Sequence, residues 1–272
     1  MKAKVILVTG ASSGIGAACA LRLARAGHRV VGVSRSGIVL PGSDNLSSRV
    51  LDIRDSAAVE RTVKEVAGDL GRLDAVINAA GVAVAGPLED TPLDLIRAQL
   101  ETTLLGAVYL IRTATPYLRQ FAPSRFIQIS SLASQVALPY QSLYCASHSA
   151  LNGLCESLRY ELEPQGVWVI VIEPGSVRTA ITKNRRTAIA GDAYRTAAGT
   201  ALGVNDVDEH QGIEAESVAR EVEQVLMTQM PPDRRSVGHW QERISLPVRG
   251  VLPARWFRRI IAAHYRIRTA MR

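Results

Sequence analysis

Short apolar runs rich in β-branched residues alternate along the chain with longer amphipathic stretches. Runs of this length are typical of strands buried in a parallel sheet, and the stretches between them are long enough for helices. The pattern predicts an α/β fold in which a doubly wound, seven-stranded parallel sheet carries helices on both faces, as one domain over 1–272. We expect the strands at 5–8, 29–34, up to 53, 75–77, 125–129, 167–172 and near 236–237.

The amphipathic stretches predict helices at 15–26, 55–70, 92–119, 142–163 and 215–228. The two longest, 92–119 and 142–163, carry apolar residues on more than one face. A helix that is apolar all round is buried, and the sheet covers only one face. The other face therefore needs a cover, which is either a second subunit or C-terminal segments of the same chain.

A glycine-rich turn follows the first apolar run directly. Gly10 permits a tight strand-to-helix turn, Gly14 lets a ligand approach the backbone, and Gly16 lets the helix pack close to the strand. Free N–H groups at the start of the helix attract phosphate. The turn therefore predicts dinucleotide binding by Gly10, Ser12, Ser13, Gly14, Ile15 and Gly16.

Five further motifs follow strand ends or open the next helix, in a fixed order. They are Leu51-Asp52-Ile53, Asn78-Ala79-Ala80-Gly81, Ser130-Ser131, Tyr144 with His148 four residues later, and Pro174-Gly175-Ser176-Val177-Arg178-Thr179. Together with the glycine-rich turn they resemble the short-chain dehydrogenase/reductase family, closely over 4–179 and loosely beyond. The resemblance implies a Rossmann-type fold, a nicotinamide cofactor, and a homodimer or homotetramer formed through the two long helices.

The corner after the second strand indicates which cofactor binds. Arg35 stands where an acidic residue would favour NAD, and a basic residue there accommodates a 2′-phosphate. With Ser36 as an additional donor, we expect NADP(H). The resemblance implies that Asp52 binds the adenine amino group and that Thr179 holds the nicotinamide carboxamide. The other expected cofactor contacts are Ile53, Asn78, Ala79, Ala80, Gly81, Thr102, Tyr144, His148, Pro174, Gly175 and Val177.

The resemblance also implies the catalytic groups and two departures from them. Tyr144 matches the general acid and Ser131 the serine that orients the carbonyl. His148 replaces the family's lysine, and Thr103 replaces an asparagine that holds a water beside that lysine. Residues four apart share a helix face, so His148 should lie beside Tyr144. Because free histidine titrates near 6.5, we expect reduction to improve toward pH 6.

We interpret these departures as a modified active site. The sequence then favours an NADPH-dependent reductase of a carbonyl in an apolar or secondary-metabolite-like compound. One alternative is an enzyme that binds NADP(H) while it catalyses cyclisation, isomerisation or elimination through Tyr144. The other is an NADP(H)-binding protein without turnover.

Composition adds limits to this picture. The chain begins Met1-Lys2-Ala3-Lys4 and then has only four strongly apolar residues, so we expect neither a signal peptide nor a membrane span. Three cysteines without metal-type spacing favour a reducing compartment, no disulfide and no metal site. We expect a cytoplasmic protein. The polar, poorly periodic segment 181–212 follows the sixth strand, where a substrate lid would lie; a surface loop is the alternative.

Positive charge is concentrated at the C-terminus. The segment 233–272 has ten arginines against Asp233 and Glu242, a net charge of +8. No helix-turn-helix, zinc or RNA-binding signature accompanies it, so we expect no nucleic-acid partner. After Pro253, apolar and aromatic residues recur at helical spacing between arginines, which fits peripheral association of 253–268 with an anionic membrane. The same stripe suits a cover over the substrate pocket or a neighbouring subunit, which is the interpretation we favour.

Overall fold

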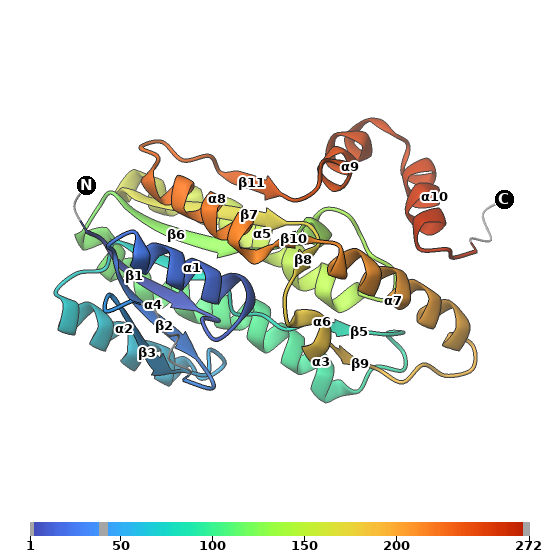
Figure 1. Ribbon diagram of the computed structural model, residues 1–272, viewed down its shortest axis with the longest axis horizontal. Coiled ribbons are helices and arrows are strands. Elements are labelled where there is room, and N and C mark those ends of the chain that lie inside the picture. Colours follow the sequence, from blue (N-terminus) through green and yellow to red (C-terminus); the bar gives the residue numbers. More distant parts are fainter. Residues whose placement is uncertain (1–2, 38–42, 269–272) are drawn as a thin grey trace.

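A parallel sheet forms the centre of the molecule (Figure 1). The computed structural model describes residues 3–37 and 43–268, and its largest sheet has the strand order β3-β2-β1-β4-β6-β7-β11, with every pairing parallel. The predicted seven-stranded, doubly wound sheet is confirmed. Its strands are β1 (Val5–Thr9), β2 (Arg29–Ser34), β3 (Leu46–Val50), β4 (Ala75–Asn78), β6 (Ser124–Ile129), β7 (Val167–Pro174) and β11 (Arg234–Val237).

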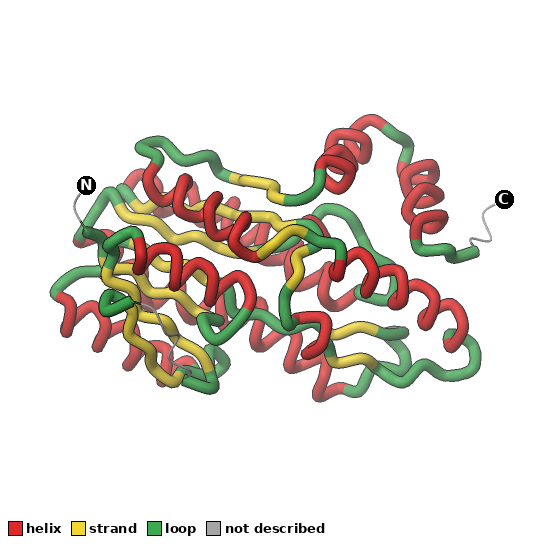
Figure 2. The backbone as a smooth tube through the Cα atoms, viewed as in Figure 1, coloured by secondary structure: helices red, strands yellow, loops and turns green. Residues whose placement is uncertain are grey.

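Helices cover both faces of this sheet (Figure 2). On one face α1 (Gly14–Arg25) packs beside α8 (Ala215–Met227). The other face is covered by α2 (Ser56–Leu70), α4 (Gly106–Gln120) and α5 (Ser142–Leu162). The strands are buried on both sides for this reason, which explains their continuous apolar runs.

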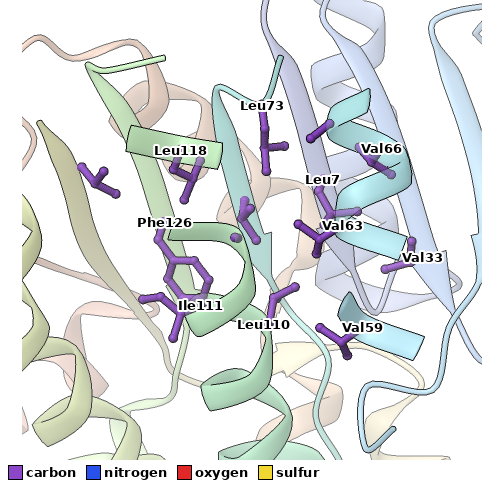
Figure 3. Close-up of a cluster of buried hydrophobic side chains, with 14 of the residues drawn as sticks. Leu7, Val33, Val59, Val63, Val66, Leu73, Leu110, Ile111, Leu118 and Phe126 are labelled. Carbon is purple, nitrogen blue, oxygen red and sulfur yellow. The ribbon is translucent and has the colours of Figure 1, made fainter. Parts of the chain in front are cut away.

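Successive residues of β1 point into different apolar clusters. Ile6 and Val8 belong to the cluster under α1 and α8, whereas Val5 and Leu7 belong to the cluster under α2 and α4. Figure 3 shows the second cluster, in which Leu7 lies close to Val63 of α2 and Phe126 of β6 lies beside Ile111 of α4. The two clusters hold the sheet and its helices together by burial of apolar surface.

The strand order reverses between β1 and β4, because the chain runs outward from β1 to β3 and then returns to β4. At such a point the helices leave the sheet in opposite directions and open a crevice beyond the carboxyl ends of the strands. The motifs singled out in the sequence all lie at this edge. β3 ends at Val50, earlier than expected, because Asp52 begins a turn in which its Oδ1 accepts the Arg54 N–H at 3.0 Å.

The predicted helix 92–119 is interrupted. It consists of α3 (Leu93–Leu100), a π-helical turn η1 (Glu101–Leu105) and α4, with helical backbone throughout. A π-helical turn adds a residue to one turn and is frequent at functional sites. The helix at 142–163 is α5, followed by a short 3₁₀ turn, η3 (Glu163–Gln165).

The segment 181–212 is more ordered than the sequence predicts. It contains α6 (Ile181–Asn184), β9 (Arg186–Thr187) and α7 (Arg195–His210). In α7 the buried positions Ala198, Ala201, Leu202 and Asn205 follow helical spacing, but small and polar residues hide the stripe. Short pairings between β5 (Val84–Ala85) and β9, and between β8 (Val177–Arg178) and β10 (Ile213–Glu214), fix both ends of the segment.

Two helices follow the last strand, α9 (Trp240–Val251) and α10 (Ala254–His264). The helix predicted after Pro253 is α10, whereas α9 was not predicted. Residues 269–272 of the expected basic extension lie outside the described residues. Across 3–37 and 43–268, no helix combines the length and the apolar character needed to cross a bilayer.

Candidate active site

The glycine-rich turn joins β1 to α1 at the crevice. Gly10 has a φ of +67°, and a Cβ at this position would lie 2.8 Å from the carbonyl oxygen of Ala79. A Cβ on Gly16 would collide with the carbonyl of Gly10. Both positions therefore require glycine, for the turn and for close helix–strand packing respectively, as the sequence predicts.

The start of α1 is open to an anionic ligand. Ser13 caps the helix in an extended conformation, but its side chain makes no capping hydrogen bond, and the first turn contains no acidic residue. The first N–H groups of a helix have no partner within the helix, and they carry the positive end of its dipole. Ser12 is half-buried and Ser13 exposed at this end. The geometry suits a phosphate group.

Asn78 braces the sheet beneath this turn. Its Oδ1 accepts the Thr9 hydroxyl at 2.5 Å, and its Nδ2 donates to Gln128 Oε1 at 2.9 Å. Thr9 Oγ1 in turn accepts the N–H groups of Ala79 and Ala80. This network links β1, β4 and β6, and through Thr9 it holds Ala79 and Ala80 against the turn.

The corner expected to bind the 2′-phosphate contains a second arginine that the sequence analysis missed. Arg35 is exposed after β2, and the Ser34 and Ser36 hydroxyls are 3.3 Å apart. Arg54 pairs with Asp52 through two nitrogens, at 2.6 Å and 3.0 Å. The hydrogen bonds from Arg54, and more weakly the charge of Arg35, lower the pKa of Asp52. Asp52 is therefore an ionised acceptor already engaged by Arg54.

Ser131 and Tyr144 lie next to each other in the wall of a cavity. Ser131 follows β6 and caps the 3₁₀ turn η2 (Leu132–Ser134), where its Oγ accepts the Ala133 N–H at 3.1 Å. Tyr144 lies in the first turn of α5, close enough for the Ser131 side chain to influence its hydroxyl. Burial raises the pKa of Tyr144 to about 12, although the neighbouring Ser131 side chain acts in the opposite direction. The phenol is therefore protonated at neutral pH.

A buried polar network fixes the Ser131 loop against α5. The Ser130 hydroxyl donates to Asn152 Oδ1 at 2.9 Å, and Asn152 Nδ2 donates to Glu173 Oε1 at 2.6 Å. Gln135 Nε2 donates to the other oxygen of Glu173 at 2.7 Å. Neither Asn152 nor Glu173 belongs to a sequence motif. Their role in fixing the loop is visible only in the fold, where α5 and β7 bring them to it.

His148 lies beside Tyr144, with ring centroids 4.4 Å apart. It is 7% exposed, and its Nδ1 is buried without a hydrogen-bond partner in the structure. Burial lowers the pKa of His148 to about 4. The expectation that His148 becomes protonated near pH 6 is therefore wrong, because the buried ring loses the hydration that stabilises the cation.

Thr103 belongs to a second buried network. Gln99 Nε2 donates to Thr103 Oγ1 at 3.1 Å and to Ser147 Oγ at 3.0 Å, while Gln99 Oε1 accepts the Val84 N–H at 2.9 Å. The Ser147 hydroxyl donates to the Tyr144 carbonyl at 2.9 Å. Thr103 thus joins the π-helical turn to α5 through Gln99, which sequence reasoning missed. Thr102, the neighbouring residue in this turn, is half-buried.

The segment after β7 connects the glycine-rich turn to the cavity. A Cβ on Gly14 would touch the Thr179 side chain at 3.3 Å, so the two residues are neighbours. Pro174, Gly175, Val177 and Thr179 line the cavity with Ile15. Glu242 of α9 covers this segment: its Oε1 accepts the Ser176 N–H at 2.7 Å, and a Cβ on Gly175 would collide with its carboxylate.

The cavity in front of Tyr144 has a volume of about 380 Å³. Asn205, Asp208 and Glu209 of α7 line one side, so part of the predicted lid segment does border it. Ile260, Ile261 and His264 of α10, and Tyr265 directly after it, also line the cavity. His264 Nε2 lies 2.8 Å from Asp208 Oδ2. This position agrees with the pocket-covering role favoured for the apolar stripe. Across the described chain, no cluster of side chains is suited to a metal ion.

The chain was compared with known protein families, proteins and structures. Residues 4–190 match the model of the short chain dehydrogenase family. The chain belongs to this family of oxidoreductases.

Among its relatives, the 3-ketodihydrosphingosine reductase of Bacteroides thetaiotaomicron is 29% identical over 98% of this chain and 100% of its own. A short-chain dehydrogenase from Streptomyces avermitilis has a similar structure, with a TM-score of 0.82 and 27% identity over 98% of this chain and 97% of its own. A Burkholderia cenocepacia short chain dehydrogenase in complex with NADP has a TM-score of 0.69 and 28% identity over 86% and 96% of the two chains.

Proposed function

We propose that the protein reduces a ketone in an apolar compound, with NADPH as the reductant and Tyr144 as the general acid. The observation that carries this proposal is that Ser131 and Tyr144 together line the wall of a cavity of about 380 Å³. Thr179 and Ile15, which lie beside the glycine-rich turn, also line this cavity. Cofactor and substrate sites are thus adjacent, as hydride transfer requires.

The residues present fit NADPH. The open start of α1 and the close approaches at Gly10 and Gly16 suit a pyrophosphate, and Arg35 with Ser36 suits a 2′-phosphate. The Burkholderia relative, whose structure contains NADP, supports this choice. When bound, the nicotinamide supplies the hydride. The protein supplies the proton and holds the carbonyl.

Ser131 and Tyr144 have different roles toward the carbonyl group of the substrate. The Ser131 hydroxyl donates a hydrogen bond that orients the carbonyl oxygen, and the Tyr144 hydroxyl donates the proton as negative charge develops there. Because the pKa of Tyr144 is raised to about 12 and His148 is neutral, the phenol is present in the acid form at neutral pH. The acid form serves reduction. Oxidation needs the phenolate, so we expect it to be slow.

The walls of the cavity favour an apolar substrate. Val136, Leu138, Ile181, Ile260 and Ile261 contribute apolar side chains around the polar pair. Apolar walls with a few polar groups at one end are typical of sites that bind small apolar compounds. The name of the Bacteroides relative makes 3-ketodihydrosphingosine the first ketone to test.

The experiment measures NADPH oxidation and the alcohol product with a panel of apolar ketones. We expect turnover by the native protein, and a loss of at least about a hundredfold in Tyr144→Phe with NADPH binding retained. Tyr140→Phe, which removes a phenol two residues before α5 that does not line the cavity, serves as the matched control. Conversion of a compound without any change in NADPH would instead support isomerisation, cyclisation or elimination. NADPH binding without any product would support a non-catalytic role.

A further inference from the structure

Exposed apolar side chains gather on the two C-terminal helices. On α9, Trp240, Ile244 and Val251 are 69%, 50% and 85% exposed, and on α10, Trp256 and Ile260 are 49% and 51% exposed. The three residues of α9 are four and seven residues apart, so they share one face of that helix. The two helices contact each other, and several large exposed apolar side chains on neighbouring elements are typical of an interaction site. We call these five residues the C-terminal apolar surface.

The same helices carry a high density of positive charge. From Arg243 to the end of the chain there is no Asp or Glu. Seven arginines of this segment are described, and all are exposed: Arg243, Arg249, Arg255, Arg258, Arg259, Arg266 and Arg268. The guanidinium of Arg259 lies 5.0 Å from the centre of the Trp256 ring, so charge and apolar surface are interleaved.

The helices also have a position that suits docking. Figure 1 shows α9 and α10 at the periphery of the molecule, beyond the end of β11, and they contact the rest of the fold along the cavity. Ile260 lines the cavity, and about half of it is exposed. The rim of the cavity therefore reaches the C-terminal apolar surface.

We propose that α9 and α10 bind the surface of an anionic phospholipid membrane. Tryptophan and isoleucine side chains enter the boundary between headgroups and acyl chains, while the arginines contact lipid phosphates. Charge complementarity selects this occupant, because a second copy would bring the same arginines face to face. A nucleic acid would attract the arginines but would not explain the apolar side chains. The docking is independent of the ketone reduction proposed above.

The test uses the full-length protein and vesicles of phosphatidylcholine, with or without phosphatidylserine. We expect co-sedimentation with the anionic vesicles at about 0.05 M salt and its loss at about 0.5 M, where charges are screened within a few ångströms. Tryptophan emission should shift to shorter wavelength with anionic vesicles. Absence of binding at low salt, or equal binding to both kinds of vesicle, would overturn the proposal.

Point substitutions test which residues contact the membrane and leave the helices that line the cavity in place. We expect Trp256→Ser, and separately Val251→Ser, to weaken vesicle binding about tenfold, the equivalent of ~1.4 kcal/mol. Arg255→Glu with Arg259→Glu should weaken it further. The matched controls are Met230→Ser, an exposed residue before β11, and Arg61→Glu on α2; both should bind like the native protein. Thermal melting followed by circular dichroism checks that each variant is folded.

Three results would contradict this assignment. Equal losses in the test and control variants would mean that the binding is not local to α9 and α10. Self-association that Trp256→Ser abolishes, without vesicle binding, would assign the surface to a second copy of the chain. Retention of a DNA duplex at a salt concentration where vesicles are not bound would assign the arginines to nucleic acid.

Discussion

Arg35 is the residue on which the choice between NADPH and NADH depends. It is exposed after β2, with Ser36 beside it, whereas Arg54 is already paired with Asp52. A charged hydrogen bond from arginine to phosphate contributes about 1.5–3 kcal/mol, so we expect NADPH to bind about ten- to a hundredfold more tightly than NADH. In Arg35→Asp we expect the preference to reverse, so that NADH binds more tightly than NADPH, as measured by fluorescence titration. Arg61→Glu is the control, and equal affinity of the native protein for both forms would contradict the prediction.

The second residue-scale prediction concerns the charge missing beside Tyr144. In His148→Lys, a positive charge about 4 Å from the phenolic oxygen is worth up to ~4 kcal/mol at an effective dielectric of about 20, which is roughly three pKa units. We expect faster alcohol oxidation and a pH profile of kcat/KM displaced to lower pH. His148→Gln, which stays neutral, should leave the profile in place. If the lysine variant loses reduction as well, histidine has a proton-transfer role of its own.

His148 also links stability to pH. Its pKa falls from 6.5 to about 4 on folding, so the unfolded chain binds the proton more tightly. The free energy of unfolding should therefore decrease as the pH falls from about 6.5 toward 4, by ~2 kcal/mol between pH 7 and pH 5 for this one group. Urea denaturation of the native protein and of His148→Gln measures it as the difference between their pH slopes. Parallel slopes would mean that the ring is hydrated in the folded state.

At the scale of elements, the buried network around Gln99 joins three of them. Gln99 connects β5, the π-helical turn and α5 through Val84, Thr103 and Ser147. Gln99→Leu would leave the Val84 N–H without its acceptor in a buried environment, at a cost of about 1–3 kcal/mol. We expect this loss in urea denaturation, together with a lower kcat, because Ser147 contacts the backbone of Tyr144. Gln120→Leu, at the exposed end of α4, is the control and should change neither quantity.

Elements differ in how well the sequence predicts them, for physical reasons. The strands and the helices α1, α2, α5 and α8 could be predicted because burial between two layers demands apolar residues at regular spacing. The helix α7 could not, because two alanines and an asparagine occupy three of its four buried positions and Leu202 alone gives no apolar pattern. The π-helical turn also leaves no apolar pattern, since its polar residue Thr103 is satisfied by Gln99.

Some residues of the candidate site could be predicted from the sequence, and others could not. Gly10, Gly16, Ser131 and Tyr144 were predictable because backbone geometry or chemistry restricts the residue type at each position. Arg54, Asn152, Glu173 and Glu242 were not, since ordinary polar residues become partners only through the fold. The neutrality of His148 was also hidden, because sequence spacing places it beside Tyr144 but does not reveal its burial.

At the scale of the whole molecule, the subunit arrangement stays a prediction. Leu110 and Ile111 are buried within the chain, whereas Leu105 is 39% exposed at the start of α4 and Tyr160 is 81% exposed on α5. Apolar surface on these two helices is compatible with the expected homodimer or homotetramer through them. It lies on elements other than α9 and α10, so subunit association and membrane docking do not compete for the same residues.

The last prediction tests how far the C-terminal helix belongs to the active site. Truncation after Leu252 removes Ile260 and Ile261 of α10 and the following residue Tyr265, all of which line the cavity. Each buried apolar side chain contributes about 1.5–3 kcal/mol, so the truncated protein should bind an apolar ketone at least about tenfold more weakly. The two apolar clusters described around the sheet include no residue of α10, so the fold and NADPH affinity should persist.

Steady-state kinetics in detergent, NADPH titration and circular dichroism measure these three quantities separately. Detergent removes any contribution of membrane docking to substrate delivery, so a raised KM reports the cavity wall itself. A KM unchanged by the truncation would mean that the substrate does not reach α10. Unfolding of the truncated protein would instead show that the contacts of Phe257 and Tyr265, both buried, are needed for the fold.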